Sequence, residues 1–329
     1  MLTSSDIIRL PYTPDLTEGG IAYACRSLPH TYDRMGGSSF ERMRRIAVGI
    51  SVELAFRRYL TGQGIPFDVR GATPFTDPDH YDVSLSGRRC DLKTFLISRR
   101  EQISALHAHP ESLLKAPALF PLDQFVADGR AANELLVFAF MTGLVAASAA
   151  ESSKALDAGQ PAYMVYAMPG AWVRPQLWAP LGVLSFKSES DMPLGLEIGG
   201  QDYTREFMMY TAHLEPHARV DVVNDLYSLA YVHASSLPQG RLSIHASIRD
   251  EAQVIRSGDW GNVWVYGMRI FLAGWAERDE FRRKSELIRE GSRVFQYDRT
   301  RTKNLAVPVE ELRPISELLS RAGEWAKDR

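Results

Sequence analysis

The chain has 329 residues, of which 45% are hydrophobic and 24% are charged, and its formal net charge at pH 7 is −2. This composition is typical of a soluble globular protein large enough for two domains, and it excludes a uniformly basic nucleic-acid coat and a disordered chain. The two cysteines, Cys25 and Cys90, exclude a disulfide scaffold and a cysteine-rich zinc site, and they favour a cytoplasmic protein.

Residues 1 to 36 are rich in Pro, Gly, Thr and Tyr and show little periodicity, which predicts an irregular N-terminal arm. The first residues lack the basic and apolar regions of a signal peptide, and no run reaches the roughly 20 strongly apolar residues of a membrane span. We therefore expect no membrane partner. From Ser38 and Ser39, which can cap a helix, apolar residues at helical spacing predict an amphipathic helix from about Phe40 to the glycines at 62–64.

The stretch from Tyr81 to Ile97, YDVSLSGRRCDLKTFLI, contains two runs of alternating apolar residues on either side of Ser-Gly at 86–87. A glycine-containing pair between such runs predicts a β-hairpin. A two-residue loop pairs residue 85 with 88 and residue 82 with 91, so Asp82 is expected directly across from Asp91 on one face. Lys93 follows two residues later and is expected on the same face.

Two opposed carboxylates repel each other unless a positive group lies between them. A divalent cation with hard oxygen ligands, Mg²⁺ or Mn²⁺, fits that position, and a lysine beside a metal-bound water suits a proton acceptor or a phosphate clamp. The face with Asp82, Asp91 and Lys93 is therefore a predicted metal site. Asp79, in the pair Pro78-Asp79, is an alternative to Asp82 as the partner of Asp91, and the hairpin register favours Asp82.

An aspartate that opens one strand and Asp-X-Lys on the next resemble the PD-(D/E)XK nuclease superfamily, which has the restriction-endonuclease-like fold. The segment GISVELAFRRYLTGQGIPFD resembles the first helix of that core, in which a glutamate faces the site; here that residue is Glu53. A surface ion pair with Arg57 at i+4 is the other interpretation of Glu53. The resemblance covers roughly residues 37 to 168. The metal ligands it implies are Asp82, Asp91 and the Leu92 carbonyl, with Lys93 orienting or deprotonating the attacking water. Glu53 would bind a second metal or position the water and the lysine.

The sequence pattern changes at about Trp172. Beyond Trp172, short apolar runs alternate with Gly, Pro, Asn and Asp turns, and a helix ends the chain. We therefore predict an α/β core, a mixed sheet flanked by helices, over residues 37–170 and a β-rich C-terminal domain over residues 171–329. The core elements predicted after the hairpin are a helix at 99–116 broken at Pro110, a strand at 133–142, a helix at 149–158 and a strand at 162–168.

Basic side chains gather at several points, and most such groups are solvated helix or loop faces. Arg88 and Arg89 differ because they lie in the hairpin beside the predicted metal, where a phosphate would approach. In RVFQYDRTRTKN, basic residues interleave with aromatic ones, a pattern that suits nucleic acid and equally a polar strand end. The predicted DNA contacts are Arg88, Arg89, Arg99, Arg100, Arg299, Arg301 and Lys303.

These patterns together predict a Mg²⁺- or Mn²⁺-dependent DNA endonuclease that hydrolyses phosphodiester bonds in restriction, host defence or repair, with the β-rich half selecting the substrate. The alternative is a non-catalytic DNA-binding or assembly subunit with a nuclease-like fold that recruits an ATPase, a helicase or a second nuclease. A metal-dependent enzyme that processes RNA is a third interpretation. DNA is the expected partner, and the sequence does not decide between a monomer and a homodimer.

Overall fold

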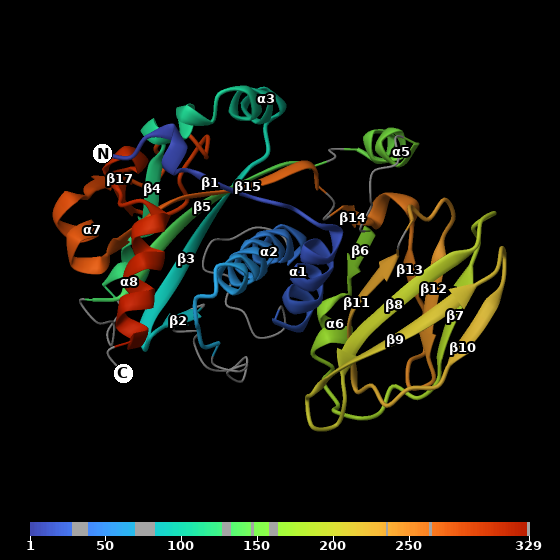
Figure 1. Ribbon diagram of the computed structural model, residues 1–329. Helices are drawn as coiled ribbons and strands as arrows, with labels where there is room; N and C mark the ends of the chain where they lie inside the picture. The colour runs from blue at the N-terminus through green and yellow to red at the C-terminus, as the bar shows by residue number, and fades with distance from the viewer. Residues whose placement is uncertain are drawn as a thin grey trace.

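The computed structural model describes residues 1–27, 39–69, 83–126, 133–145, 148–157, 164–234, 236–262 and 265–327. An α/β part and a β-sandwich lie side by side, with helices α1 (Pro14–Ser27) and α2 (Ser39–Gly62) between them (Figure 1). This arrangement confirms the prediction of a mixed sheet with helices together with β-rich structure. No helix in the described part of the chain is long and apolar enough to cross a membrane.

The central sheet of the α/β part has five strands in the order β1-β15-β5-β3-β2. Only β3 and β5 run parallel, and the other neighbours are antiparallel. The strands are β1 (Ile8–Leu10), β2 (Val83–Leu85), β3 (Arg88–Ile97), β5 (Leu135–Val145) and β15 (Val265–Glu277). Between β3 and β5 the chain passes through α3 (Arg100–Ala108), η3 (Pro110–Lys115), β4 (Pro117–Pro121) and α4 (Leu122–Phe125).

Alternation along β3 divides its side chains between two hydrophobic cores. Cys90 and Leu92 pack in the core that α2 covers, together with α1 and α8 (Ile315–Lys327). Phe95 and Ile97 pack in the opposite core, which is rich in phenylalanine and is covered by α3, α4 and α7 (Arg278–Lys284). Each face of β3 is therefore buried under helices, as the prediction of a sheet flanked by helices requires.

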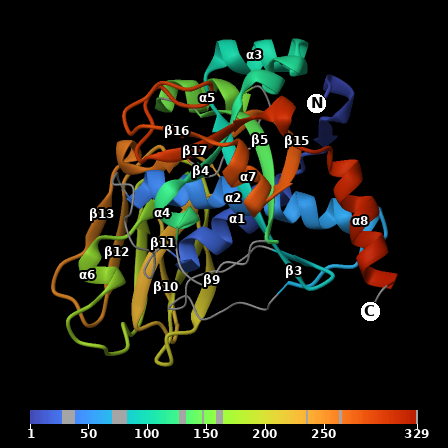
Figure 2. The ribbon, with the colours of Figure 1, turned by 90° about the vertical axis from the view of Figure 1, so that its left-hand side faces the viewer.

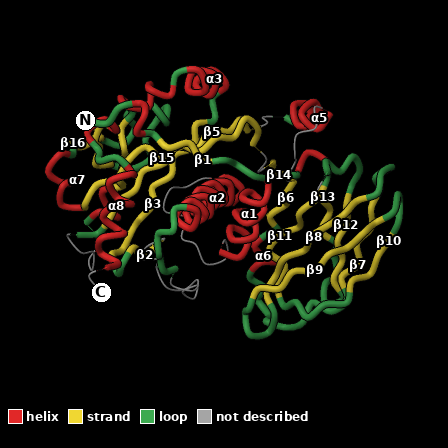
Figure 3. Tube along the Cα trace, viewed as in Figure 1, coloured by secondary structure: helices red, strands yellow, loops and turns green. Residues whose placement is uncertain are grey.

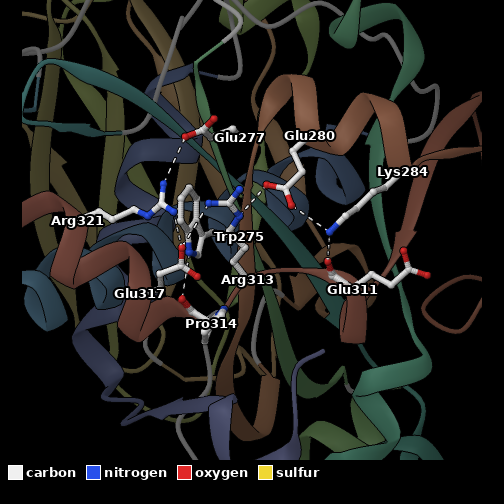
Figure 4. Close-up of polar contacts among 9 residues, drawn as sticks. All are labelled: Trp275, Glu277, Glu280, Lys284, Glu311, Arg313, Pro314, Glu317 and Arg321. Atoms are coloured by element: carbon white, nitrogen blue, oxygen red, sulfur yellow. Dashed lines mark hydrogen bonds and ion pairs between the residues drawn. The ribbon is translucent and has the colours of Figure 1, made fainter.

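A network of ion pairs fastens the last helices to the central sheet (Figure 4). Arg313 lies 2.7 Å from Glu280 of α7 and 3.3 Å from Glu317 of α8, and Arg321 lies 2.8 Å from Glu317. The Trp275 indole of β15 donates to the Pro314 carbonyl oxygen, and α8 runs beside β15 (Figure 2). The other elements of this region are β16 (Glu286–Ile288), β17 (Asn304–Pro308), which pairs with β4, η5 (Val309–Glu311) and, at the N-terminus, η1 (Ser4–Asp6).

The β-sandwich consists of two antiparallel sheets that enclose a core with Phe186, Leu229 and Ile244 (Figure 3). One sheet has the order β14-β6-β11-β8-β9, and the other has the order β10-β7-β12-β13. Its elements are β6 (Met164–Ala167), α6 (Gly170–Val173), β7 (Leu184–Ser188), β8 (Leu194–Gln201), β9 (Phe207–Leu214), β10 (Arg219–Val222), β11 (Ser228–Ala234), β12 (Leu242–Ala246), β13 (Gln253–Ile255), η4 (Ser257–Asp259) and β14 (Gly261–Asn262).

The predicted boundary between residues 170 and 171 does not coincide with these two parts. The predicted last strand of the core, β6, pairs with β11 and β14 in the sandwich. By contrast, β15 pairs with β5 in the central sheet. The sandwich is therefore inserted in the α/β part, between α5 (Ala149–Asp157) and β15. Apolar periodicity finds a strand but does not tell which sheet it joins, and this explains the difference.

Within the predicted irregular arm, residues 1–27 instead form η1, β1 and α1, and residues 28–36 lie outside the described residues. β1 pairs antiparallel with β15, and α1 packs along α2. The glycines that made this stretch look irregular permit that packing, because a Cβ on Gly20 would clash with the carbonyl oxygen of Ala47. Glycine serves here for close approach of two backbones.

Gly20→Ala is expected to lower the free energy of unfolding by about 1–3 kcal/mol, because the added methyl group forces α1 away from α2. Gly49→Ala is the matched control, since Gly49 lies in α2 and a Cβ there meets no atom within 4 Å. The control should gain about 0.5–1 kcal/mol through helix propensity. Urea denaturation measures both changes, and equal stability of the two variants would contradict the close helix contact.

Candidate functional site

The predicted hairpin is present, and its register is the predicted one. Ser86 and Gly87 form the loop, with φ angles of 49° and 77°, in the left-handed region that a type I′ turn requires. The pairs are Val83 with Cys90, Ser84 with Arg89 and Leu85 with Arg88. Asp82 and the alternative Pro78-Asp79 lie outside the described residues, so the opposition of Asp82 and Asp91 stays a prediction.

Asp91 and Lys93 form an ion pair on the face of β3 that is turned away from α2. Asp91 is only 6% exposed, and its Oδ1 lies 2.9 Å from Lys93 Nζ. The ammonium also donates to Gln124 Oε1 at 3.2 Å and lies 4.4 Å from the centre of the Phe120 ring. Lys93 is therefore fixed from two sides, by its own strand and by α4.

A second ion pair lies beside the first, at the start of β5. Arg278 Nη1 is 2.8 Å from Glu134 Oε2, and the two side chains are 10% and 0% exposed. The Arg278 guanidinium lies 4.3 Å from the centre of the Phe125 ring. Asp91 registers with Leu136, two residues after Glu134, so both pairs belong to the same face of the sheet. Helix α4 therefore contacts both pairs, through Gln124 and Phe125.

Sequence reasoning missed Gln124, Glu134 and Arg278. A charged residue directly before the apolar run LLVFAF was a signal for Glu134, because a charge at the start of a buried strand needs a partner. Arg278 is 144 residues further along the chain, and no local pattern connects the two. Gln124 lies in a helix of four residues, too short for a periodic pattern.

The donor atoms fit a divalent cation in part. Asp91 offers a carboxylate on the predicted strand, which is a hard oxygen ligand of the kind that Mg²⁺ and Mn²⁺ prefer. Within the described ranges, no three His, Cys, Asp or Glu side chains lie close enough to hold a metal ion together. A cation at Asp91 would therefore need the Leu92 carbonyl and the undescribed Asp82 as further ligands.

Glu53 lies on α2, which covers the other face of the central sheet. It is buried, with 8% exposure, and pairs with Arg57 one turn later on α2. The i+4 pair that the sequence suggested is thus present, but it is buried rather than on the surface. Because α2 covers the face of β3 opposite to Lys93, the structure does not group Glu53 with the Asp91–Lys93 pair.

The predicted DNA contacts in and after the hairpin already have partners. The Arg88 guanidinium lies 4.1 Å from the centre of the Trp325 ring of α8. Arg89, which registers with Ser84 in the hairpin, also has an interaction of its own. Arg99 lies 2.5 Å from Asp298, and Arg100 lies 3.0 Å from Glu151. Arg99 therefore joins the start of α3 to the loop that carries the remaining candidates.

Arg299, Arg301 and Lys303 lie on a loop that leads into β17, and all three are exposed. Just before them, Val294 and Tyr297 exchange backbone hydrogen bonds in a turn, so this segment is not the polar strand end that the sequence also suggested. Thr300, between the two arginines, is buried, so burial alternates with exposure along this part of the loop.

This basic loop ends beside the candidate site. The Leu122 backbone N–H, at the start of α4, donates to the Lys303 carbonyl oxygen at 2.9 Å. The same short helix carries Gln124, which holds Lys93. The candidate site thus comprises the Asp91–Lys93 pair and a basic loop joined to it through α4, and the Glu134–Arg278 pair lies beside it. Comparison of the chain with protein-family models, with curated proteins and with solved structures finds no match.

Proposed function

We propose that this chain is a metal-dependent DNA endonuclease that hydrolyses phosphodiester bonds at the face of β3 carrying Asp91 and Lys93. The observation that carries the proposal is a buried carboxylate 2.9 Å from an ammonium, on alternate residues of the second strand of a tight hairpin. Burying such a pair costs more than burying apolar side chains of similar size, so a chemical role is a reason for its presence. The crossover from β3 through α3 to the parallel β5 also agrees with the restriction-endonuclease-like core.

In the proposed reaction, Asp91, Asp82 and the Leu92 carbonyl would hold Mg²⁺ or Mn²⁺, and the cation would supply positive charge for the phosphate and acidity for the attacking water. Lys93 Nζ donates to Asp91 Oδ1 and to Gln124 Oε1, and a lysine ammonium has three N–H donors. One N–H of the three then remains for the attacking water or for a phosphate oxygen. Lys93 is therefore assigned to orienting these groups. Glu53 is left out of the site, because α2 lies on the other face.

A second candidate is a non-catalytic DNA-binding subunit in which the same pair serves the fold. The contacts of Lys93 favour it, since Asp91, Gln124 and the Phe120 ring surround the ammonium as in a packed structural pair. In that case the exposed side chains of Arg299, Arg301 and Lys303 would bind DNA without cleavage.

Incubation of the purified protein with supercoiled plasmid in Mg²⁺, Mn²⁺ or EDTA separates the two candidates. An endonuclease converts the plasmid to open-circular or linear DNA with either metal and leaves it intact in EDTA. An RNA of matched sequence, treated in the same way, tests the RNA-processing alternative. DNA binding without cleavage under all of these conditions would contradict the enzyme and support the subunit.

A further inference from the structure

One end of the β-sandwich carries three aromatic side chains that the candidate site does not use. Trp178 lies between α6 and β7, Tyr203 lies in the turn between β8 and β9, and Tyr227 directly precedes β11. The ring centres of Trp178 and Tyr227 are 5.6 Å apart, and those of Tyr203 and Tyr227 are 6.5 Å apart. The Trp178 indole N–H donates to the Tyr203 carbonyl oxygen at 3.1 Å. Three separate segments are thus held together around a group of rings.

These rings lie at the surface rather than in the sandwich core. Tyr203 is 69% exposed, Trp178 and Tyr227 are partly exposed, and the neighbouring Leu177 is exposed as well. A ring with this exposure gains little from burial, so the packing of the sandwich does not explain its presence. Exposed aromatic and apolar groups gathered in one place are typical of a binding surface.

Arg205 adds a cation to the same group. Its φ angle is 69°, a conformation that glycine adopts without the steric cost that a side chain brings. Asp202 holds this turn, because its carboxylate accepts hydrogen bonds from the backbone N–H groups of Thr204 and Glu206. The Arg205 guanidinium lies 4.9 Å from the centre of the Trp178 ring. A large side chain at a position that favours glycine indicates a role outside the turn.

The segment that carries Trp178 also lines a basic pocket of about 580 Å³. Leu177 and Ala179, the residues on either side of Trp178, contribute to its wall together with Arg174 and Arg249. The Arg249 guanidinium lies 4.3 Å from the centre of the Trp172 ring, which fixes its position. Cations suited to phosphate groups therefore lie next to ring faces suited to bases.

We propose that Trp178, Tyr203, Arg205 and Tyr227 form a platform on which unpaired bases of single-stranded DNA stack, with the adjoining phosphates at the basic pocket. Stacking accepts any base, because every base has an aromatic face, and an arginine in the platform adds a cation–π contribution. This inference deepens the proposed function by naming unpaired DNA as the form that is recognised. It rests on that function only for the choice of DNA as the polymer.

Binding of the full chain to a fluorescent oligothymidylate of about 12 nucleotides, followed by anisotropy in EDTA, tests the platform without cleavage. Tyr203→Ser removes one exposed ring and is expected to weaken this binding by about 5- to 150-fold, the range for loss of one stacked base. An abasic strand of the same length keeps the phosphates and lacks the bases. It should bind the wild type and Tyr203→Ser equally.

Arg205→Gly is a second variant, and His217→Gly is its matched control. His217 also has a positive φ angle, 55°, in the turn before β10, and it bonds Asp191 at 2.9 Å, away from the platform rings. Each glycine relieves the same backbone strain, so both variants should unfold at or above the wild-type temperature. Only Arg205→Gly should bind oligothymidylate more weakly.

Equal affinity of the wild type, Tyr203→Ser and Arg205→Gly for oligothymidylate would overturn the proposal and leave a carbohydrate or a peptide as the occupant. An equal loss on the abasic strand would also overturn it, because the surface would then read charge alone. Normal, platform-dependent binding by a protein that cleaves no plasmid would support the platform and remove the endonuclease. The two proposals therefore fail separately.

Discussion

Lys93→Met is expected to lower the rate of plasmid cleavage by about 10²- to 10⁴-fold while DNA and Mn²⁺ binding persist. The methionine keeps an apolar stem over the Phe120 ring and removes every N–H that Lys93 offers to Gln124, to water or to phosphate. Binding of the metal should persist, because the proposed ligands are oxygen atoms of other residues. Plasmid cleavage measures the first effect, and titration calorimetry with Mn²⁺ measures the second.

Lys284→Met provides the matched control for this experiment. Lys284 Nζ lies 3.0 Å from Glu280 and donates to the Glu311 carbonyl oxygen, so it too is paired, but in the network of α7 and α8 (Figure 4). Cleavage by this variant should be unchanged. The complementary change, Asp91→Asn, should abolish Mn²⁺ binding. Wild-type cleavage by Lys93→Met, or wild-type Mn²⁺ affinity of Asp91→Asn, would return the pair to a structural role.

The hairpin could be predicted from the sequence because the signals that determine it are local. The Ser86–Gly87 turn and the alternation on either side of it fix which residues pair, and Lys93 follows Asp91 onto the same face by the period of a strand. The helix predicted from Phe40 to the glycines at 62–64 is confirmed as α2 for the same reason, since its apolar residues recur at helical spacing.

The parts that sequence reasoning missed depend on contacts between distant segments. β15 comes after all the strands of the sandwich in the sequence, yet it belongs to the central sheet. Its apolar pattern would suit either sheet, so the pattern alone does not assign it. Gly20 looked like a loop residue because its helix partner, Ala47, cannot be identified from a single sequence. Glu134 meets Arg278 through pairing of β5 with β15, so its role emerges only with the topology.

That second pair leads to the other large effect, which concerns stability. Glu134→Ala is expected to lower the free energy of unfolding by about 3–5 kcal/mol, because it leaves the Arg278 guanidinium buried against Phe125 without its carboxylate. Urea denaturation measures the loss. Arg241→Ala serves as the control for removal of a surface pair, since the Arg241 and Glu189 side chains that bond each other in the β-sandwich are 61% and 37% exposed. The control should cost less than about 1 kcal/mol.

The double variant Glu134→Leu with Arg278→Met then separates the two ion pairs on this face of the sheet. Both new side chains are apolar and suit the surrounding phenylalanine core, so the double variant should recover most or all of the stability that Glu134→Ala loses. It should also cleave plasmid at the wild-type rate, because Glu134 and Arg278 bond each other and the proposed reaction gives them no part. Loss of cleavage in a stably folded double variant would contradict this division and would place Arg278 beside Lys93 among the groups that contact DNA.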